Sequence, residues 1–249
     1  GHQVVVHARL MLRIAQDRLP ELVGISQAYR EAEQQSLRTS QRAASRLWSL
    51  DPPELKQEGF KLLEYNAKTW PSSLQTRLAL AMACYATGQM DRSRELYEEL
   101  LDEFPNNTVV LNDLAWILQE SAENYERALE LANRGLRVAP NDESLLDTRA
   151  TVFTNMPDRL VDAKKDFDTI RRLCLQDPQP RPRLATTLLK LARVCVALEE
   201  IPEAKQHATR ALEVNAELNV LDEQERAEIS SILQMDSVAS EAAPTVGGD

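Results

Sequence analysis

Glycine and aromatic residues are scarce in this chain. Of its 249 residues, 7 are glycine and 5% are aromatic. The abundant residues are instead Ala, Leu, Glu, Arg and Gln, which lose little side-chain entropy when they enter a helix. With 43% hydrophobic residues, the chain has enough apolar surface for one elongated domain or two compact ones. We therefore expect an all-α fold.

Cysteine and histidine are also few, with three of each. The cysteines lie far apart, form no CxxC pair and are odd in number, which indicates buried free thiols rather than disulfides. The histidines are too few and too scattered to complete a metal site with these cysteines. We expect neither a metal nor a cofactor. The residues concerned are Cys84, Cys174, Cys195, His2, His7 and His207.

Long apolar runs are missing as well. No run reaches the roughly 18 residues that would cross a bilayer, and Gln3 to His7 is too short and too weakly flanked for a secretory signal. We expect a soluble segment, placed in the cytoplasm or periplasm. The compartment itself stays open.

Signatures of catalysis are not found. The sequence contains no phosphate-binding glycine loop, no HExxH and no Gly-x-Ser-x-Gly. We therefore expect a protein that is not an enzyme.

The chain is acidic, with a net charge of −10, which argues against binding nucleic acid. Residues 158–193 reverse this balance and form a candidate binding feature for an acidic partner. The basic side chains of this segment are Arg159, Lys164, Lys165, Arg171, Arg172, Arg181, Arg183, Lys190 and Arg193.

Proline and small residues recur at a fixed interval. Pro71, Pro105 and Pro140 are 34 and 35 residues apart, and each separates two amphipathic stretches. Small or aliphatic residues repeat at the same interval between them. These are Leu47, Ala81, Ala115 and Ala150. A constant period near 34 residues indicates a repeat protein.

The order of residues within each period resembles the tetratricopeptide repeat. One copy contains Leu80, Ala81, Gly88, Tyr97 and Pro105, in the order helix, tight turn, helix, stop. The next copy repeats this plan with Leu111, Leu114, Ala115, Leu118, Tyr125, Ala128, Ala132, Gly135 and Pro140. The run that begins at Leu111 is similar to bacterial members of the family. The resemblance implies a right-handed α-solenoid of stacked antiparallel helix pairs.

We expect four to five such units, at about 40–73, 74–107, 108–142, 143–184 and 185–220. N-terminal helices over residues 1–39, which can also be read as a degenerate repeat, would precede them. A capping helix over 221–235 and a flexible tail over 236–249 would follow. The sequence does not decide whether residues 20–50 form one helix or two.

In this family the first helices of the units line a concave groove that binds partners. Carrying the family's offsets onto this chain, together with the nearby Lys190, gives a predicted partner-binding groove. Its residues are Trp48, Leu78, Met82, Tyr85, Asn112, Trp116, Gln119, Asp147, Thr151, Leu189, Lys190 and Arg193. Members that hold chaperone tails have a Lys and Asn clamp at four of these positions. Here the four residues are Leu78, Met82, Asn112 and Trp116, so a single Asn remains and the clamp is not formed.

Several of these side chains allow two interpretations. Trp48 and Trp116 either anchor a ligand or fill space between helices. Lys190 and Arg193 lie three apart on one helical face, where they either clamp a carboxylate or phosphate or face solvent. Arg149 stands where the family has a buried Leu, so it either extends to solvent or pairs with Asp147 or another acid.

The resemblance implies a non-catalytic scaffold that binds a partner peptide or protein. One alternative is a self-assembling structural element, which would form homo-oligomers. Another is the recruiting region of a larger multidomain protein. The sequence does not identify the partner.

Overall fold

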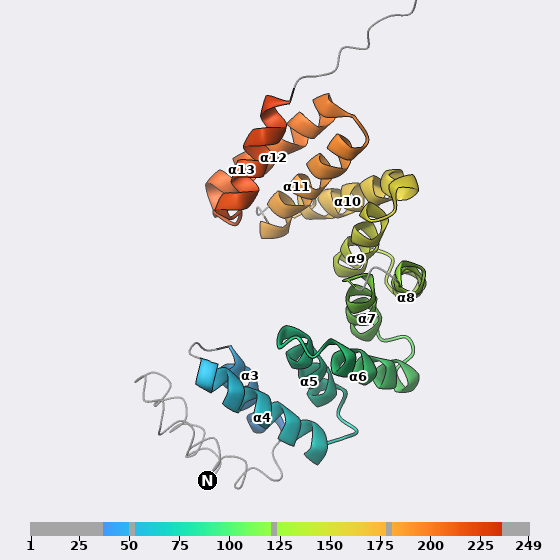
Figure 1. Cartoon of the computed structure of the whole chain (residues 1–249), viewed down its shortest axis with the longest axis vertical. Coiled ribbons are helices and arrows are strands. Elements are labelled where there is room, and N and C mark those ends of the chain that lie inside the picture. Colours follow the sequence, from blue (N-terminus) through green and yellow to red (C-terminus); the bar gives the residue numbers. More distant parts are fainter. Residues whose placement is uncertain (1–36, 50–52, 121–123, 178–180, 236–249) are drawn as a thin grey trace, which may run out of the picture. The chain divides into compact units, whose positions relative to one another are not determined.

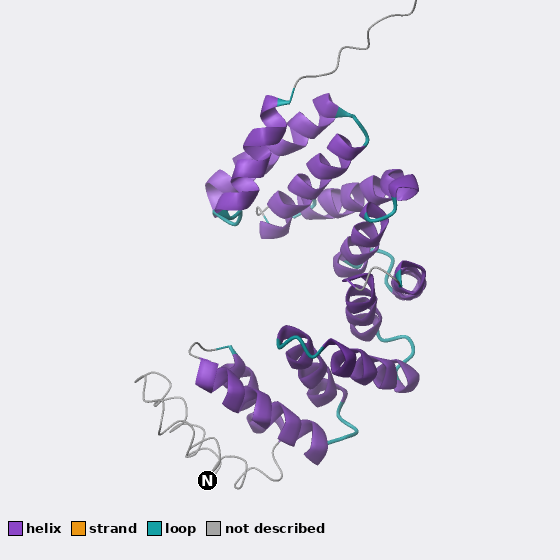
Figure 2. Ribbon diagram, viewed as in Figure 1, coloured by secondary structure: helices purple, strands orange, loops and turns teal. Residues whose placement is uncertain are grey.

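A computed structural model describes residues 37–49, 53–120, 124–177 and 181–235. Within these ranges it contains eleven α-helices, one short 3-10 helix and no strand (Figures 1 and 2). The all-α prediction is confirmed. Residues 1–36 of the expected N-terminal helices and the expected tail over 236–249 lie outside the described residues, as does most of the segment 20–50.

The helices follow one another with short connections. They are α3 (Leu37–Trp48), α4 (Pro53–Thr69), α5 (Leu74–Ala86), α6 (Met90–Glu103), α7 (Thr108–Glu120), α8 (Tyr125–Val138), α9 (Glu143–Thr154), η1 (Pro157–Arg159), α10 (Leu160–Leu175), α11 (Pro182–Ala197), α12 (Ile201–Leu218) and α13 (Glu223–Gln234).

The repeating prolines lie in the connections after α4, α6 and α8. Pro71, Pro105 and Pro140 are all exposed and stand outside helices. A proline has no amide hydrogen for a helix interior, so it separates one helix from the next. Side-chain caps then start the following helices: Ser73 accepts from the amide of Thr76, and Asp142 accepts from the amide of Leu145.

The chain divides into two compact units, the first ending at Ile117 and the second beginning at Leu118. In the first unit, α3 packs on α4, α4 on α5 and α5 on α6. A Cβ atom at Gly59 would lie 2.5 Å from the backbone nitrogen of Trp48, so this glycine allows α3 and α4 to approach closely. Its main core consists of Ala43, Ala44, Leu47, Leu55, Leu62, Leu63, Leu80, Ala83 and Cys84.

The second unit contains the helices from α8 onward. Each of α8 to α12 packs on the helix after it, and α13 also contacts α11. Phe167, Leu145 and Ile170 are at the centre of its core and are almost fully buried. At the start of α13, Asp222 and Glu225 form a reciprocal capping box.

Within the described part of the chain, no helix has both the length and the apolar character that a membrane span requires.

Candidate binding site

Aromatic side chains surround a cavity of about 250 Å³ in the first unit. We call this cavity the aromatic pocket. Four helices contribute to it, since its residues come from α3, α5, α6 and α7. The lining residues are Trp48, Met82, Tyr85, Ala86, Tyr97, Asp113, Trp116 and Ile117.

Helical spacing explains why these residues converge. Met82 and Tyr85 are three apart on α5, and Asp113 and Trp116 are three apart on α7, so each pair lies on one helical face. Trp48, the last residue of α3, closes the same pocket. Met82 is 56% exposed and stands at the rim.

Three hydrogen bonds fix the polar atoms of the pocket. The indole Nε1–H of Trp116 donates to the phenol oxygen of Tyr85 at 2.9 Å. The hydroxyl of Tyr97 donates to Oδ2 of Asp113 at 2.9 Å, and the amide Nδ2 of Asn112 donates to its Oδ1 at 3.1 Å. The pocket therefore has a preset shape, with one carboxylate in an aromatic wall.

Burial raises the pKa of Asp113 above its usual range, although the hydrogen bonds from Asn112 and Tyr97 act in the opposite direction. Burial is also the largest cause that raises the pKa of Tyr97, and the neighbouring carboxylate adds to it. Among the described residues, Asp113 forms no ion pair with a lysine, arginine or histidine. Its negative charge is compensated by neutral donors alone.

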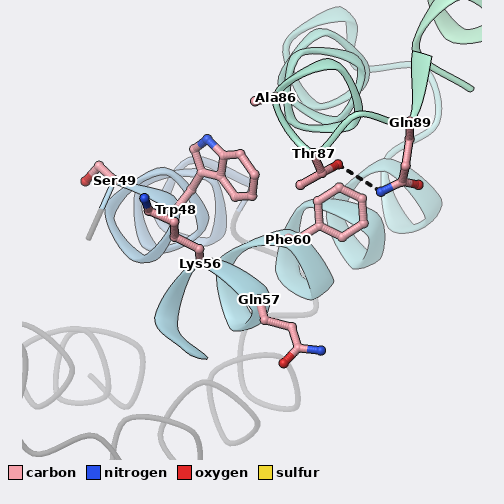
Figure 3. A pocket seen from close by; sticks show the side chains of 8 residues that line it. All are labelled: Trp48, Ser49, Lys56, Gln57, Phe60, Ala86, Thr87 and Gln89. Carbon is pink, nitrogen blue, oxygen red and sulfur yellow. Dashed lines mark hydrogen bonds between the residues drawn. The ribbon is translucent and has the colours of Figure 1, made fainter. Parts of the chain in front are cut away.

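A second cavity, of about 640 Å³, lies beside the aromatic pocket and shares Trp48 and Ala86 with it. Figure 3 shows the rings of Trp48 and Phe60 close together among the residues that line this cavity, and their centroids are 6.1 Å apart. On the α5 side, the amide of Gln89 donates to the hydroxyl of Thr87 at 2.9 Å. Trp48 therefore lines both of these cavities.

The second unit has a cavity of about 290 Å³ whose basic groups are already paired. Lys190 Nζ lies 2.6 Å and 2.8 Å from the two carboxylate oxygens of Asp147. Arg193 donates twice to Glu228, at 2.7 Å and 2.6 Å, and this pairing lowers the pKa of Glu228. The lining residues are Thr151, Thr154, Leu160, Phe167, Lys190, Arg193, Val194 and Ala197.

The other basic side chains of segment 158–193 are also paired with acids. Each of its nine basic side chains lies within 4.0 Å of a carboxylate of the same chain. The acids involved are Glu143, Asp147, Asp162, Asp168, Glu200, Glu203 and Glu228. Each basic side chain of this segment therefore has a carboxylate partner within the chain, with which an acidic ligand would have to compete.

The predicted groove residues separate into two groups. Trp48, Met82, Tyr85 and Trp116 meet in the aromatic pocket, and Asn112 bonds to its carboxylate. In the second unit, Thr151, Lys190 and Arg193 line a cavity and Asp147 holds Lys190. Neither group includes Leu78.

Two predicted groove residues are buried. Leu189 is 1% exposed and belongs to the core of the second unit, so its assignment to a groove face is wrong. Gln119 is 7% exposed, and its side-chain oxygen accepts a long hydrogen bond from Asn155 at 3.4 Å. The sequence analysis in turn missed Asp113 and Tyr97 as pocket residues. The spacing of three between Asp113 and Trp116 is the signal that would have found the first.

Arg149 pairs with an acid, one of the interpretations that the sequence left open. It donates to both oxygens of Asp166, at 2.7 Å and 2.8 Å, and to the amide oxygen of Asn133 at 2.7 Å. Asp147 is not its partner, because that carboxylate binds Lys190.

The structure also corrects the expectation that the histidines are too scattered to share a site with the cysteines. Because α11 packs on α12, ligand atoms of Cys195, Glu203 and His207 all lie within 4.8 Å of one another. Glu203 is already engaged by Lys164, which lies 2.7 Å away and also binds Glu200. Burial raises the pKa of Cys195 to about 12 and lowers the pKa of His207, so both groups are held in their neutral forms.

No protein-family model and no curated protein matches this chain. Solved structures do resemble it. TTC0263, a thermophilic TPR protein of Thermus thermophilus, is 19% identical over 80% of this chain and 100% of its own, with a TM-score of 0.62. MamA of Desulfovibrio magneticus RS-1 is 16% identical over 75% of this chain and 97% of its own, with a TM-score of 0.59. TPR-like repeats ascribed to a kinesin light chain of Podosopora anserina are 17% identical over 75% and 98%, with a TM-score of 0.58.

Proposed function

Since the chain has the fold of a tetratricopeptide-repeat protein, we propose that it is a non-catalytic scaffold that binds a protein or peptide through the aromatic pocket. A helical repeat offers a partner a preformed surface, and its stacked helices supply side chains at regular intervals. The proposal concerns how the protein binds, and it places the principal contact in the first unit.

The observation that carries this proposal is the convergence of Trp48, Tyr85 and Trp116 on one open cavity. Large aromatic side chains dominate the binding energy of many protein interfaces, because each removes much surface from water at a small cost in conformational entropy. All three are partly exposed, and Met82 beside them is the most exposed large hydrophobic residue of the described chain.

The chemistry of the pocket favours binding over catalysis. Its acidic groups are Asp113 and tyrosine hydroxyls, and the pKa of Tyr97 is raised, so its hydroxyl stays protonated. Asp113 is the single carboxylate among the lining residues, and no serine, cysteine, lysine or histidine lies beside it there to form a nucleophile–base pair.

Two finer assignments follow the same reasoning. The second-unit cavity is a weaker candidate for an acidic partner, because Lys190 and Arg193 would have to release Asp147 and Glu228 first. The aromatic pocket could serve two other uses: self-assembly of the chain, or recruitment of a partner to a larger protein of which this chain is a part. We place the protein in a bacterial cytoplasm or periplasm.

Affinity capture from the source organism, with chemical crosslinking, tests the proposal. The native chain is compared with Trp116→Ala, which removes one wall of the pocket, and with Trp70→Ala as the matched control. Trp70 is also partly exposed and belongs to the first unit, but it packs on Tyr65 outside the pocket.

We expect a partner that is recovered by the native chain and by Trp70→Ala and lost with Trp116→Ala. Equal recovery by all three proteins would show that binding lies elsewhere. Recovery of the chain itself alone, together with a concentration-dependent mass in light scattering, would favour self-assembly.

A further inference from the structure

We propose that the aromatic pocket binds a basic side chain, an arginine or a lysine, that projects from a protein partner. This inference rests on the proposed function and adds to it the chemical class of the group that enters the pocket.

Asp113 favours a positively charged ligand. Its carboxylate is partly buried in the pocket wall, and a carboxylate in such a place is costly unless a positive charge lies near it. The two observed donors, Tyr97 and Asn112, each bond to one oxygen. A carboxylate offers about four acceptor positions, so capacity for a cationic donor is left on both oxygens.

The aromatic rings of the pocket also favour a cation. Trp48, Tyr85, Tyr97 and Trp116 all line the same cavity. Aromatic faces attract ammonium and guanidinium groups through the ring quadrupole, and tryptophan does so most strongly. The methylene groups of an arginine or lysine would lie against apolar surface, since Met82 and Ile117 complete the lining.

Other ligand classes fit less well. A phosphate or carboxylate would be repelled by Asp113. A purely apolar side chain would remove Asp113 from water without supplying a charge, which leaves a buried carboxylate uncompensated. A cation with an apolar stem is the class that satisfies both the rings and the acid.

The contrast with the second unit supports this choice. There the acids Asp147 and Glu228 already hold lysine and arginine from the same chain. Asp113 has no such partner among the described residues. The net charge of −10 adds a long-range attraction for a basic partner.

Short peptides test the inference without knowledge of the partner. The probes are acetyl-Gly-Arg-Gly-amide and acetyl-Gly-Lys-Gly-amide, with citrulline and norleucine in the central position as uncharged controls. Binding is followed by the NMR signals of the tryptophan indole N–H groups in the full chain. We expect the arginine and lysine peptides to shift the Trp116 indole signal and to bind about tenfold or more tightly than the controls.

Two variants locate the effect. Asp113→Asn keeps the size of the side chain and removes its charge, and we expect it to weaken the arginine peptide about tenfold or more while the citrulline peptide is unchanged. Asp102→Asn is the matched control, because it removes one charge from an exposed position of the same unit, and it should bind as the native chain does. If Asp113→Asn does not fold, Met82→Lys at the exposed rim supplies the test, since a fixed cation there should repel the charged peptides.

Equal binding of the arginine and citrulline peptides would overturn the inference, as would unchanged arginine binding by Asp113→Asn or Met82→Lys. Absence of any indole shift with all four peptides would overturn it too. The proposed function is judged separately by capture with Trp116→Ala. A partner lost with Trp116→Ala, combined with no preference for charged peptides, would refute the basic side chain and keep the binding surface.

Discussion

The indole Nε1–H of Trp116 donates a hydrogen bond of 2.9 Å to the phenol oxygen of Tyr85, 31 residues earlier in the chain. The bond connects α7 to α5 inside the first unit and fixes the plane of the indole ring. The wall of the aromatic pocket is thus set before any ligand arrives, which lowers the entropic cost of binding.

Tyr85→Phe tests this bond. The variant keeps the ring and removes the acceptor, so we expect a loss of about 1 kcal/mol in the free energy of unfolding. Urea denaturation followed by tryptophan fluorescence measures it. A variant as stable as the native chain would mean that water replaces the phenol oxygen at no cost.

Asp113 gives a stability that depends on pH with a definite sign. Its pKa is raised in the folded protein, so the folded state binds the proton more tightly than the unfolded state does. Its contribution to stability is therefore present below the unfolded pKa and is lost as the pH rises through the folded pKa.

We accordingly expect Asp113→Asn to be more stable than the native chain at pH 7, because it removes the ionised carboxylate from a partly buried site. The difference should shrink as the pH is lowered toward the ordinary aspartate pKa of about 4. Thermal melts at several pH values measure it. The raised pKa of Asp113 would be contradicted if Asp113→Asn gained less stability over the native chain at pH 7 than at low pH.

The Arg149–Asp166 pair should behave as a buried ion pair, since Arg149 replaces an apolar residue of the repeat. Asp166 is 9% exposed and Arg149 is 23% exposed at the side chain. Arg149→Met leaves the carboxylate buried without its partner, at a cost of about 3 kcal/mol.

The double variant Arg149→Met, Asp166→Leu should recover most of this loss, because neither charge is then buried. Guanidinium denaturation of the native, single and double variants measures the coupling. A double variant no more stable than the single one would mean that the pair contributes through its geometry rather than its charge.

The repeat was readable from the sequence because its signals are local. Pro71, Pro105 and Pro140 mark the ends of helix pairs through the missing amide, and apolar spacing marks the buried faces. The offsets of the repeat also bring Trp48, Tyr85 and Trp116 to one pocket. Their role in binding a partner stays a prediction.

The charges were not readable in the same way, because the acids that pair with Lys190 and Arg193 lie on other helices. Lys190 is 43 residues from Asp147, and Arg193 is 35 residues from Glu228. Asp147 lies in the expected repeat before that of Lys190, and Glu228 lies on α13. A count of charges in a single segment misses ion pairs that join it to a neighbouring repeat or to the capping helix. Leu189, next to Lys190, was misplaced for a related reason: its face of α11 is covered by the core.

The three thiols should react slowly in the folded protein. Cys84, Cys174 and Cys195 are buried, and burial raises the pKa of each. For Cys195 the pKa rises to about 12, although Lys164 opposes the shift. The thiolate is the reactive form, so little of it is present at pH 8.

Alkylation with iodoacetamide at pH 8, read by peptide mass spectrometry, checks this expectation. Cys195 should be the slowest of the three in the native chain, and all three should react at similar rates in urea. Rapid modification of Cys195 without denaturant would show that α11 and α12 separate readily.

Backbone strain can be tested in the turns that follow α5 and α11, because one has a glycine and the other a glutamate at a position with positive φ. Gly88 has a φ of +76° in the first of these turns, and Glu199 has a φ of +61° in the second. A side chain disfavours this left-handed region by about 1–2 kcal/mol, so the second turn stores strain that the first avoids. Glu199→Gly should therefore stabilise the chain by roughly 0.5–1 kcal/mol, after allowance for the greater freedom of glycine in the unfolded state.

Gly88→Ala is the opposite change, because it adds a side chain to a residue with positive φ. No atom lies within 4 Å of the position that its Cβ would occupy, so steric contact adds nothing and the expected loss of about 1 kcal/mol comes from the backbone alone. Urea denaturation of both variants checks the pair. If Glu199→Gly lowers the stability instead, the exposed Glu199 side chain must stabilise the turn after α11 by more than the backbone strain costs.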